Sequence, residues 1–164
     1  MTSVERAGDR ELVITRTFNA PPSVVFKAWS QPELFRRWWV PKSAPGIVLV
    51  GCDMDVRTGG KYRLEFGSGG PDTMAFYGKY LDVVPNERIV WTNDEEDEGA
   101  ITTVTFKDLG GSTLVTFHEA YPSIEAANRI DLGPVSRRPS LDARAGQQVL
   151  KLRQLLRQSG RGAR

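Results

Sequence analysis

The chain has 164 residues and a formal net charge of +2, with 40% hydrophobic and 26% charged residues. This size predicts one domain that buries its own hydrophobic core, and no apolar run is long enough to cross a membrane. The single cysteine, Cys52, excludes an internal disulfide, and with His118 as the one histidine it also excludes cysteine-cluster and multi-histidine metal sites. We therefore expect a cytoplasmic protein with no metal and no cofactor.

The charge is distributed unevenly along the chain. Residues 137–164 contain eight Lys and Arg and one Asp, a net charge of +7, whereas residues 1–136 carry 14 basic and 19 acidic residues, a net charge of −5. A basic segment can attract phosphate groups or an acidic partner, but no aromatic residues stand among these arginines to stack on bases. We therefore interpret the segment as the solvent face of a helix and expect no nucleic-acid partner.

The N-terminal part predicts a strand followed by two helices. Residues 1–10 are polar and are expected to be disordered. Residues 11–18 alternate apolar and polar side chains, as in a half-buried strand, and a proline pair ends this segment. The apolar runs at 24–29 and 33–39 then predict two short helices, which a proline between them separates into an elbow.

From Gly46 to about residue 119 the pattern becomes that of β-strands. Turns rich in glycine, asparagine and proline separate the alternating segments, and such short connections predict an antiparallel meander. The predicted strands cover residues 47–52, 61–66, 74–84, 88–93, 101–107 and 113–118. We interpret the acidic run at 94–98 as a solvated loop.

The C-terminal part predicts one long helix after an irregular stretch at 120–138. Ser140 is a suitable N-cap, and apolar residues recur every three or four positions up to Gln158. The tail at 159–164 is expected to be disordered. This order of elements predicts a single α+β domain over residues 11–158. Its curved antiparallel sheet has about seven strands, two short helices follow the first strand, and the long C-terminal helix lies across the sheet.

Sequence signatures in this order resemble one known family. They lie at residues 18–29, 32–41, 55–62 and 85–92. Together they resemble the family named after the activator of the heat-shock protein 90 ATPase, which belongs to the START-like superfamily of helix-grip folds and is related in shape to polyketide cyclases. The resemblance covers about residues 11–119 and implies a helix-grip fold with a role in small-molecule binding or stress response. Residues 128–139 depart from the family pattern, because they contain no tryptophan.

Large side chains on the predicted strands and on the second helix are the candidate ligand-binding residues. Alternation places the strand residues on one face of the sheet, where they form the core or, if the last helix does not fill the concavity, the walls of an apolar pocket. We predict a small hydrophobic ligand between the sheet and the C-terminal helix, with tyrosine hydroxyls orienting its polar end. The candidates are Trp38, Tyr62, Leu64, Phe66, Phe76, Tyr80, Trp91, Phe106 and His118.

His118 is also a weak candidate for catalysis, as a general acid or base on the pocket wall. No nucleophile motif accompanies it, so an ordinary strand histidine is the simpler interpretation, and the favoured hypothesis is a non-enzymatic carrier or stress-related protein. Two alternatives stay open: a co-chaperone-like module that binds a protein partner through the last helix or the acidic loop, and a cyclase- or hydrolase-type enzyme. An exposed edge strand would also permit a homodimer.

Overall fold

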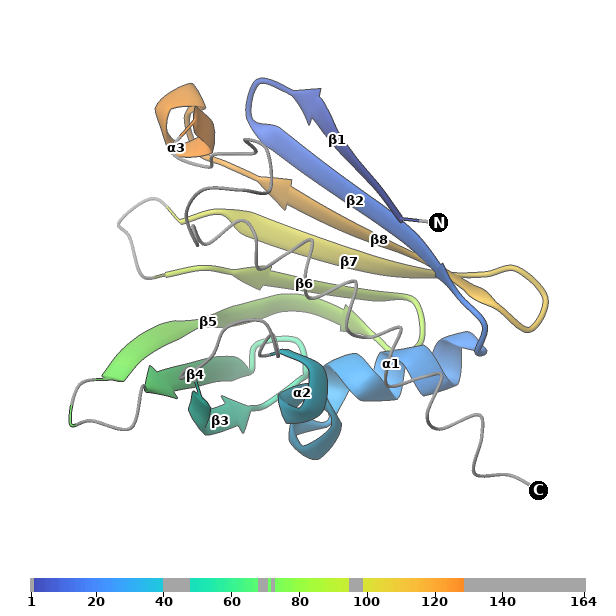
Figure 1. The fold of residues 1–164 in the computed structure, drawn as a ribbon, viewed down its shortest axis with the longest axis horizontal. Helices are drawn as coiled ribbons and strands as arrows, with labels where there is room; N and C mark the ends of the chain where they lie inside the picture. Colours follow the sequence, from blue (N-terminus) through green and yellow to red (C-terminus); the bar gives the residue numbers. More distant parts are fainter. Residues whose placement is uncertain (1, 40–47, 68–70, 72, 95–98, 129–164) are drawn as a thin grey trace.

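The computed structural model of the chain describes residues 2–39, 48–67, 71, 73–94 and 99–128. These residues form an eight-stranded antiparallel sheet in the order β1-β2-β8-β7-β6-β5-β4-β3, together with three helices (Figure 1). The strands are β1 (Thr2–Gly8), β2 (Glu11–Phe18), β3 (Val48–Met54), β4 (Lys61–Gly67), β5 (Thr73–Val84), β6 (Arg88–Thr92), β7 (Ile101–Asp108) and β8 (Thr113–Ala120). The helices are α1 (Pro22–Ser30), α2 (Pro32–Trp39) and α3 (Ile124–Asn128).

The predicted antiparallel sheet and helical elbow are confirmed, with the ends of each predicted element displaced by at most two residues. The sheet has eight strands rather than about seven, because Thr2–Gly8 forms β1 where disorder was predicted. β1 shows no apolar periodicity, and it forms by backbone pairing along the edge of β2, with Val4 opposite Ile14. The short helix α3 likewise lies in the stretch that was predicted to be irregular.

The long C-terminal helix predicted up to Gln158 and the tail at 159–164 lie outside the described residues. Residues 95–98 of the predicted acidic loop also lie outside them. None of the helices in the described part of the chain is both long and apolar enough to span a membrane.

The elbow between α1 and α2 is held by two prolines and one buried indole. Pro22 begins α1 and Pro32 begins α2, positions where a missing N–H costs no helical hydrogen bond. Trp38 on α2 is fully buried, and its Nε1 donates a hydrogen bond to the Ala28 carbonyl oxygen at 2.9 Å. This bond joins the two helices, of which α2 lies beside β3 (Figure 1) and α1 packs against β7.

One face of the sheet carries the hydrophobic core, and we call it the inner face. Leu12 and Ile14 of β2 are buried on it, in agreement with the period of two along a strand. Cross-strand pairing extends the face, because Ile14 lies opposite Phe117 and Phe117 lies opposite Val104. The buried apolar residues of the inner face are Leu12, Ile14, Phe18, Leu49, Tyr62, Leu64, Phe66, Tyr80, Ile89, Val104, Phe106, Val115 and Phe117.

Candidate functional site

All of the predicted ligand-binding residues except His118 lie on the inner face or pack against it. Trp38 packs from α2, and the strand residues are Tyr62, Leu64, Phe66, Phe76, Tyr80, Trp91 and Phe106. Phe76 and Trp91 are half-buried, and the others are at most 8% exposed. The alternation in the sequence therefore correctly predicted that these side chains share one face. Their role in binding stays a prediction.

His118 lies on the opposite, outer face of the sheet, so its predicted place on the pocket wall is wrong. Its neighbour Phe117 is 4% exposed and belongs to the core, and successive side chains of a strand point to opposite faces. On the outer face, His118 Nε2 lies 3.4 Å from Glu11 Oε2, and both side chains are partly exposed. A histidine in this position does not reach the inner face.

Aromatic rings pack the inner face where the helices meet the sheet. Trp29 of α1 is 2% exposed, and its ring centroid lies 4.7 Å from that of Trp38 and 6.2 Å from those of Phe106 and Trp91. Aromatic pairs at these separations bury large areas and stabilise a small core. Trp38 and Phe106 are therefore core residues, whereas Trp91 is only half-buried.

A chain of hydrogen-bonded polar side chains crosses the inner face next to Trp91, the cross-strand partner of Thr102. The Tyr62 hydroxyl lies 3.2 Å from Asn93 Oδ1, and Asn93 Nδ2 donates to Thr102 Oγ1 at 3.1 Å. The Thr102 hydroxyl donates to Glu119 Oε1 at 3.3 Å, and the Tyr121 hydroxyl donates to Glu119 Oε2. We call these five residues the polar chain. Both carboxylate oxygens of Glu119 therefore accept a hydroxyl hydrogen bond.

Strand register explains why the polar chain meets the aromatic residues. Glu119 lies between its cross-strand partners Leu12 and Thr102, and the row continues through Trp91 to Tyr80. Two polar side chains therefore stand in a row that is otherwise apolar. Thr102 is only 1% exposed, so its hydroxyl needs the hydrogen bonds that it makes.

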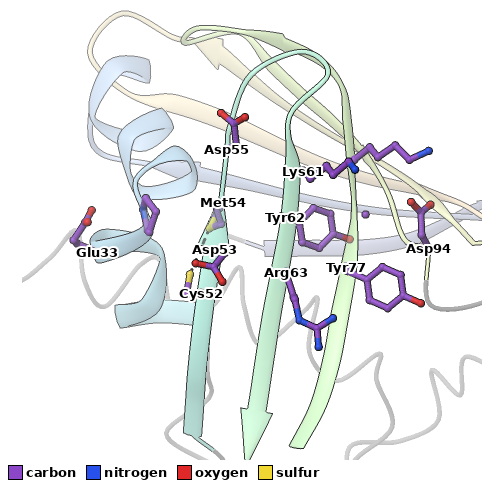
Figure 2. Close-up of a pocket in the computed structure, with 13 residues that line it drawn as sticks. Glu33, Cys52, Asp53, Met54, Asp55, Lys61, Tyr62, Arg63, Tyr77 and Asp94 are labelled. Atoms are coloured by element: carbon purple, nitrogen blue, oxygen red, sulfur yellow. Dashed lines mark hydrogen bonds between the residues drawn. The ribbon is translucent and has the colours of Figure 1, made fainter.

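Gly78 allows Tyr62 to join the polar chain. It is the cross-strand partner of Tyr62, and a Cβ at this position would lie 2.0 Å from the Thr92 carbonyl oxygen and 2.9 Å from Tyr62 Cε1. Without that Cβ, the Tyr62 ring extends from β4 over β5 (Figure 2), and its hydroxyl donates to the Thr92 carbonyl oxygen at 2.8 Å. A side chain at residue 78 would displace both the ring and the neighbouring strand.

Two ionisable side chains near Tyr62 are held in their neutral forms. Burial, with smaller contributions from Cys52 and Asp55, raises the pKa of the Tyr80 hydroxyl well above its usual range. Burial also raises the pKa of the Cys52 thiol, whose Sγ lies 3.6 Å from Met54 Sδ. Cys52 is therefore not an activated nucleophile. Across the described residues, no group of three or more His, Cys, Asp or Glu is placed to hold a metal ion.

Most of the polar chain was missed from the sequence. The missed residues are Asn93, Thr102, Glu119 and Tyr121. The signal that could have found them is the apolar spacing of Val115 and Phe117, because continued alternation along β8 turns Glu119 inward and His118 outward. His118 was predicted to line the pocket because a histidine can act as an acid or base, and this placed His118 on the inner face in the position that Glu119 occupies.

Comparison with known proteins agrees with the fold. Residues 19–147 match the family model described as activator of Hsp90 ATPase homolog 1-like protein, whereas a comparison with curated proteins finds no match. A crystal structure of a Rhodobacter sphaeroides protein superposes with a TM-score of 0.81 at 17% identity, covering 96% of this chain and 99% of that one. Protein CV1439 of Chromobacterium violaceum gives a TM-score of 0.69 at 26% identity, with coverages of 90% and 97%. The AHSA1-like protein of Aeromonas hydrophila gives 0.64 at 18% identity, with coverages of 93% and 96%. The chain belongs to the family of activator of Hsp90 ATPase homolog 1-like proteins.

Proposed function

We propose that the inner face binds a small, largely apolar molecule whose polar end lies against the polar chain. The observation that carries this proposal is a carboxylate, Glu119, held by two hydroxyl groups in a face whose buried side chains are mostly aromatic and aliphatic, with Arg16, Thr102 and Thr113 as the buried polar residues. Ligand sites for small molecules combine predominantly apolar walls with a few convergent polar groups. Membership of a START-like family, in which binding of hydrophobic ligands is common, supports the same function.

Stability does not account for the polar chain. Glu119 is half-buried, so its carboxylate loses part of its hydration at a cost in free energy, and apolar residues of similar volume at such positions are often neutral or stabilising. The row Leu12–Glu119–Thr102–Trp91 could be apolar throughout and would then pack as an ordinary sheet core. The carboxylate is better explained by a ligand whose polar end it recognises.

The proposed roles follow from burial. Trp91 and Phe76 are half-buried and would contact the apolar part of the ligand, and Tyr62, Glu119 and Tyr121 would contact its polar end. The remaining predicted residues form the supporting wall behind them. These residues are Trp38, Leu64, Phe66, Tyr80 and Phe106.

The test is displacement of a neutral apolar fluorophore, N-phenyl-1-naphthylamine, by decanol and by decane from the full chain. We expect decanol to displace the fluorophore more strongly than decane, and Glu119→Gln to weaken decanol binding by about fivefold, which corresponds to one hydrogen bond of about 1 kcal/mol. The matched control is Glu11→Gln, which makes the same chemical change on the outer face. A chain that does not bind the fluorophore, or equal effects of the two substitutions, would overturn the proposal.

The two other hypotheses have less support in the described residues. The protein-interaction alternative depended on the last helix and the acidic loop, and the helix and residues 95–98 lie outside those residues. The enzyme alternative depended on His118 or on a tyrosine of the pocket, and His118 lies on the outer face next to Glu11. The inner-face binding function is therefore the one that we carry forward.

A further inference from the structure

An open groove crosses β3, β4 and β5 beside the start of α2 (Figure 2). Its volume is about 780 Å³, within the range of about 300–1,000 Å³ that is typical of small-molecule sites. The charged side chains of β4 and β5 that line it are exposed, and they alternate with the buried inner-face residues Tyr62 and Tyr80. The groove shares Tyr62 with the polar chain, but its charged side chains take no part in the proposed inner-face site.

The charges of the groove are sorted by strand. Asp53 on β3 and Glu33 near the start of α2 form an acidic wall, and Lys61 on β4 and Lys79 on β5 form a basic wall. Lys61 and Lys79 are direct cross-strand partners, and Asp53 is the partner of Arg63. Figure 2 shows Glu33 and Asp53 on the α2 side of the groove and Lys61 on the β5 side.

Two further charges of the groove are neutralised by neighbours on their own side. Arg57 Nε lies 2.8 Å from Asp55 Oδ2, and Arg63 Nε lies 2.7 Å from Glu65 Oε1. These exposed pairs contribute little to stability, but each pairs a charge of the groove with an opposite charge, so that Asp55 and Arg63 add no net charge to the groove. The acidic wall then depends on Asp53 and Glu33, and the basic wall on the two lysines.

The lysine pair is unfavourable in the absence of a counter-ion. Like charges directly opposite each other on neighbouring strands repel, and in the described part of the chain neither Lys61 nor Lys79 has a carboxylate within 4.0 Å. Asp94 lines the far end of the same wall, where its backbone N–H donates to the Tyr77 carbonyl oxygen. One net positive charge therefore remains on this wall, facing two negative charges on the other.

We propose that this groove binds a zwitterionic small molecule, with its anionic group between Lys61 and Lys79 and its cationic group against Asp53. Asp53 and Lys61 are diagonal cross-strand neighbours, which sets the spacing of the two ligand charges at about 7–8 Å or slightly more. A ligand with one charge would satisfy one wall and be repelled by the other. Opposite charges at both walls give such a site selectivity for the doubly charged molecule.

The experiment is a ¹H–¹⁵N NMR titration of the full chain with 6-aminohexanoate, hexanoate and hexylamine. The first molecule carries both charges at about the required spacing, and each of the others keeps only one of them. We expect 6-aminohexanoate to bind about fivefold more tightly than either of the others, as two exposed ion pairs allow. Its shift changes should centre on the backbone amides of residues 52–55, 61–63 and 77–79.

Two substitutions and two matched controls complete the test. Asp53→Asn and Lys79→Gln should each reduce the affinity for 6-aminohexanoate to about that of a singly charged molecule. Asp9→Asn and Lys107→Gln make the same changes at exposed positions outside the groove and should leave it unaltered. The proposal would be overturned by equal affinities for 6-aminohexanoate and hexanoate, or by no detectable binding. It would also be overturned by chemical-shift changes that are confined to residues 91–121 of the inner face. Failure of the inner-face function would not affect this result.

Discussion

Replacing Gly78 by alanine tests whether the Tyr62 ring crosses β5 as described. The new Cβ would lie 2.0 Å from the Thr92 carbonyl oxygen and 2.9 Å from Tyr62 Cε1, so that both the neighbouring strand and the ring must move. Overpacking of this kind costs about 1–3 kcal/mol, and losing the Tyr62 hydrogen bond to Thr92 adds about 1 kcal/mol. We therefore expect Gly78→Ala to lower the free energy of unfolding by about 2–4 kcal/mol.

The assay is urea unfolding followed by tryptophan fluorescence, with Gly8→Ala as the matched control. A Cβ at Gly8 would have no atom within 4 Å, so this variant should stay within about 0.5 kcal/mol of the natural chain. Tyr62→Phe should cost about 1 kcal/mol, and the double variant with Gly78→Ala should cost less than the sum of the two, because both remove the same hydrogen bond. If Gly78→Ala is as stable as Gly8→Ala, the described path of the Tyr62 ring is incorrect.

Three further variants test other parts of the description. Trp38→Phe should lower the free energy of unfolding, measured in urea, by about 2 kcal/mol, because the hydrogen bond to the Ala28 carbonyl oxygen is lost inside the core. An unchanged free energy of unfolding would show that this hydrogen bond does not hold α1 and α2 together. His118→Gln should leave displacement of the naphthylamine fluorophore unchanged, since the side chain lies on the outer face, and a lost response would place the histidine in the binding site. The raised pKa of Tyr80 means that the folded state holds this proton more tightly than the unfolded state. The contribution of this proton to the free energy of unfolding should therefore be complete below pH 10.0 and be lost as the pH rises above it. Tyr80→Phe should reduce this alkaline loss of stability, measured by urea unfolding at a series of pH values. Identical losses in the natural chain and the variant would contradict the raised pKa of Tyr80.

The sheet and the elbow could be predicted because their signals are local. Period-two alternation, turn residues between the segments and a proline between two apolar runs determine each element from a few neighbouring residues. β1 could not be found in this way. Its side chains at residues 2–8 show no apolar alternation, and its strand state depends on backbone hydrogen bonds with β2, which the sequence of β1 does not encode.

The binding face was predictable, but its polar chain was not. Tyr62, Trp91 and the other large side chains were assigned to one face because bulky apolar residues dominate the pattern. Thr102 and Glu119 are ordinary polar residues in alternating strands, and only the register of β7 on β8 brings them together. Because register is a relation between two segments, a single sequence gives weak information about such a pair.

Different parts of the inner face stabilise the fold and bind the proposed ligand. Where the helices meet the sheet, Trp29 and Trp38 close the core with aromatic contacts and a buried hydrogen bond, so substitutions there should act on the free energy of unfolding. Along the polar chain, Thr102 and Glu119 place hydroxyl and carboxylate groups where an apolar row would pack equally well. Replacing both by an isosteric apolar pair, Thr102→Val with Glu119→Leu, should therefore keep or raise stability while removing discrimination between decanol and decane. A large loss of stability in that double variant would instead make the polar chain a structural element and leave the inner face without its proposed ligand.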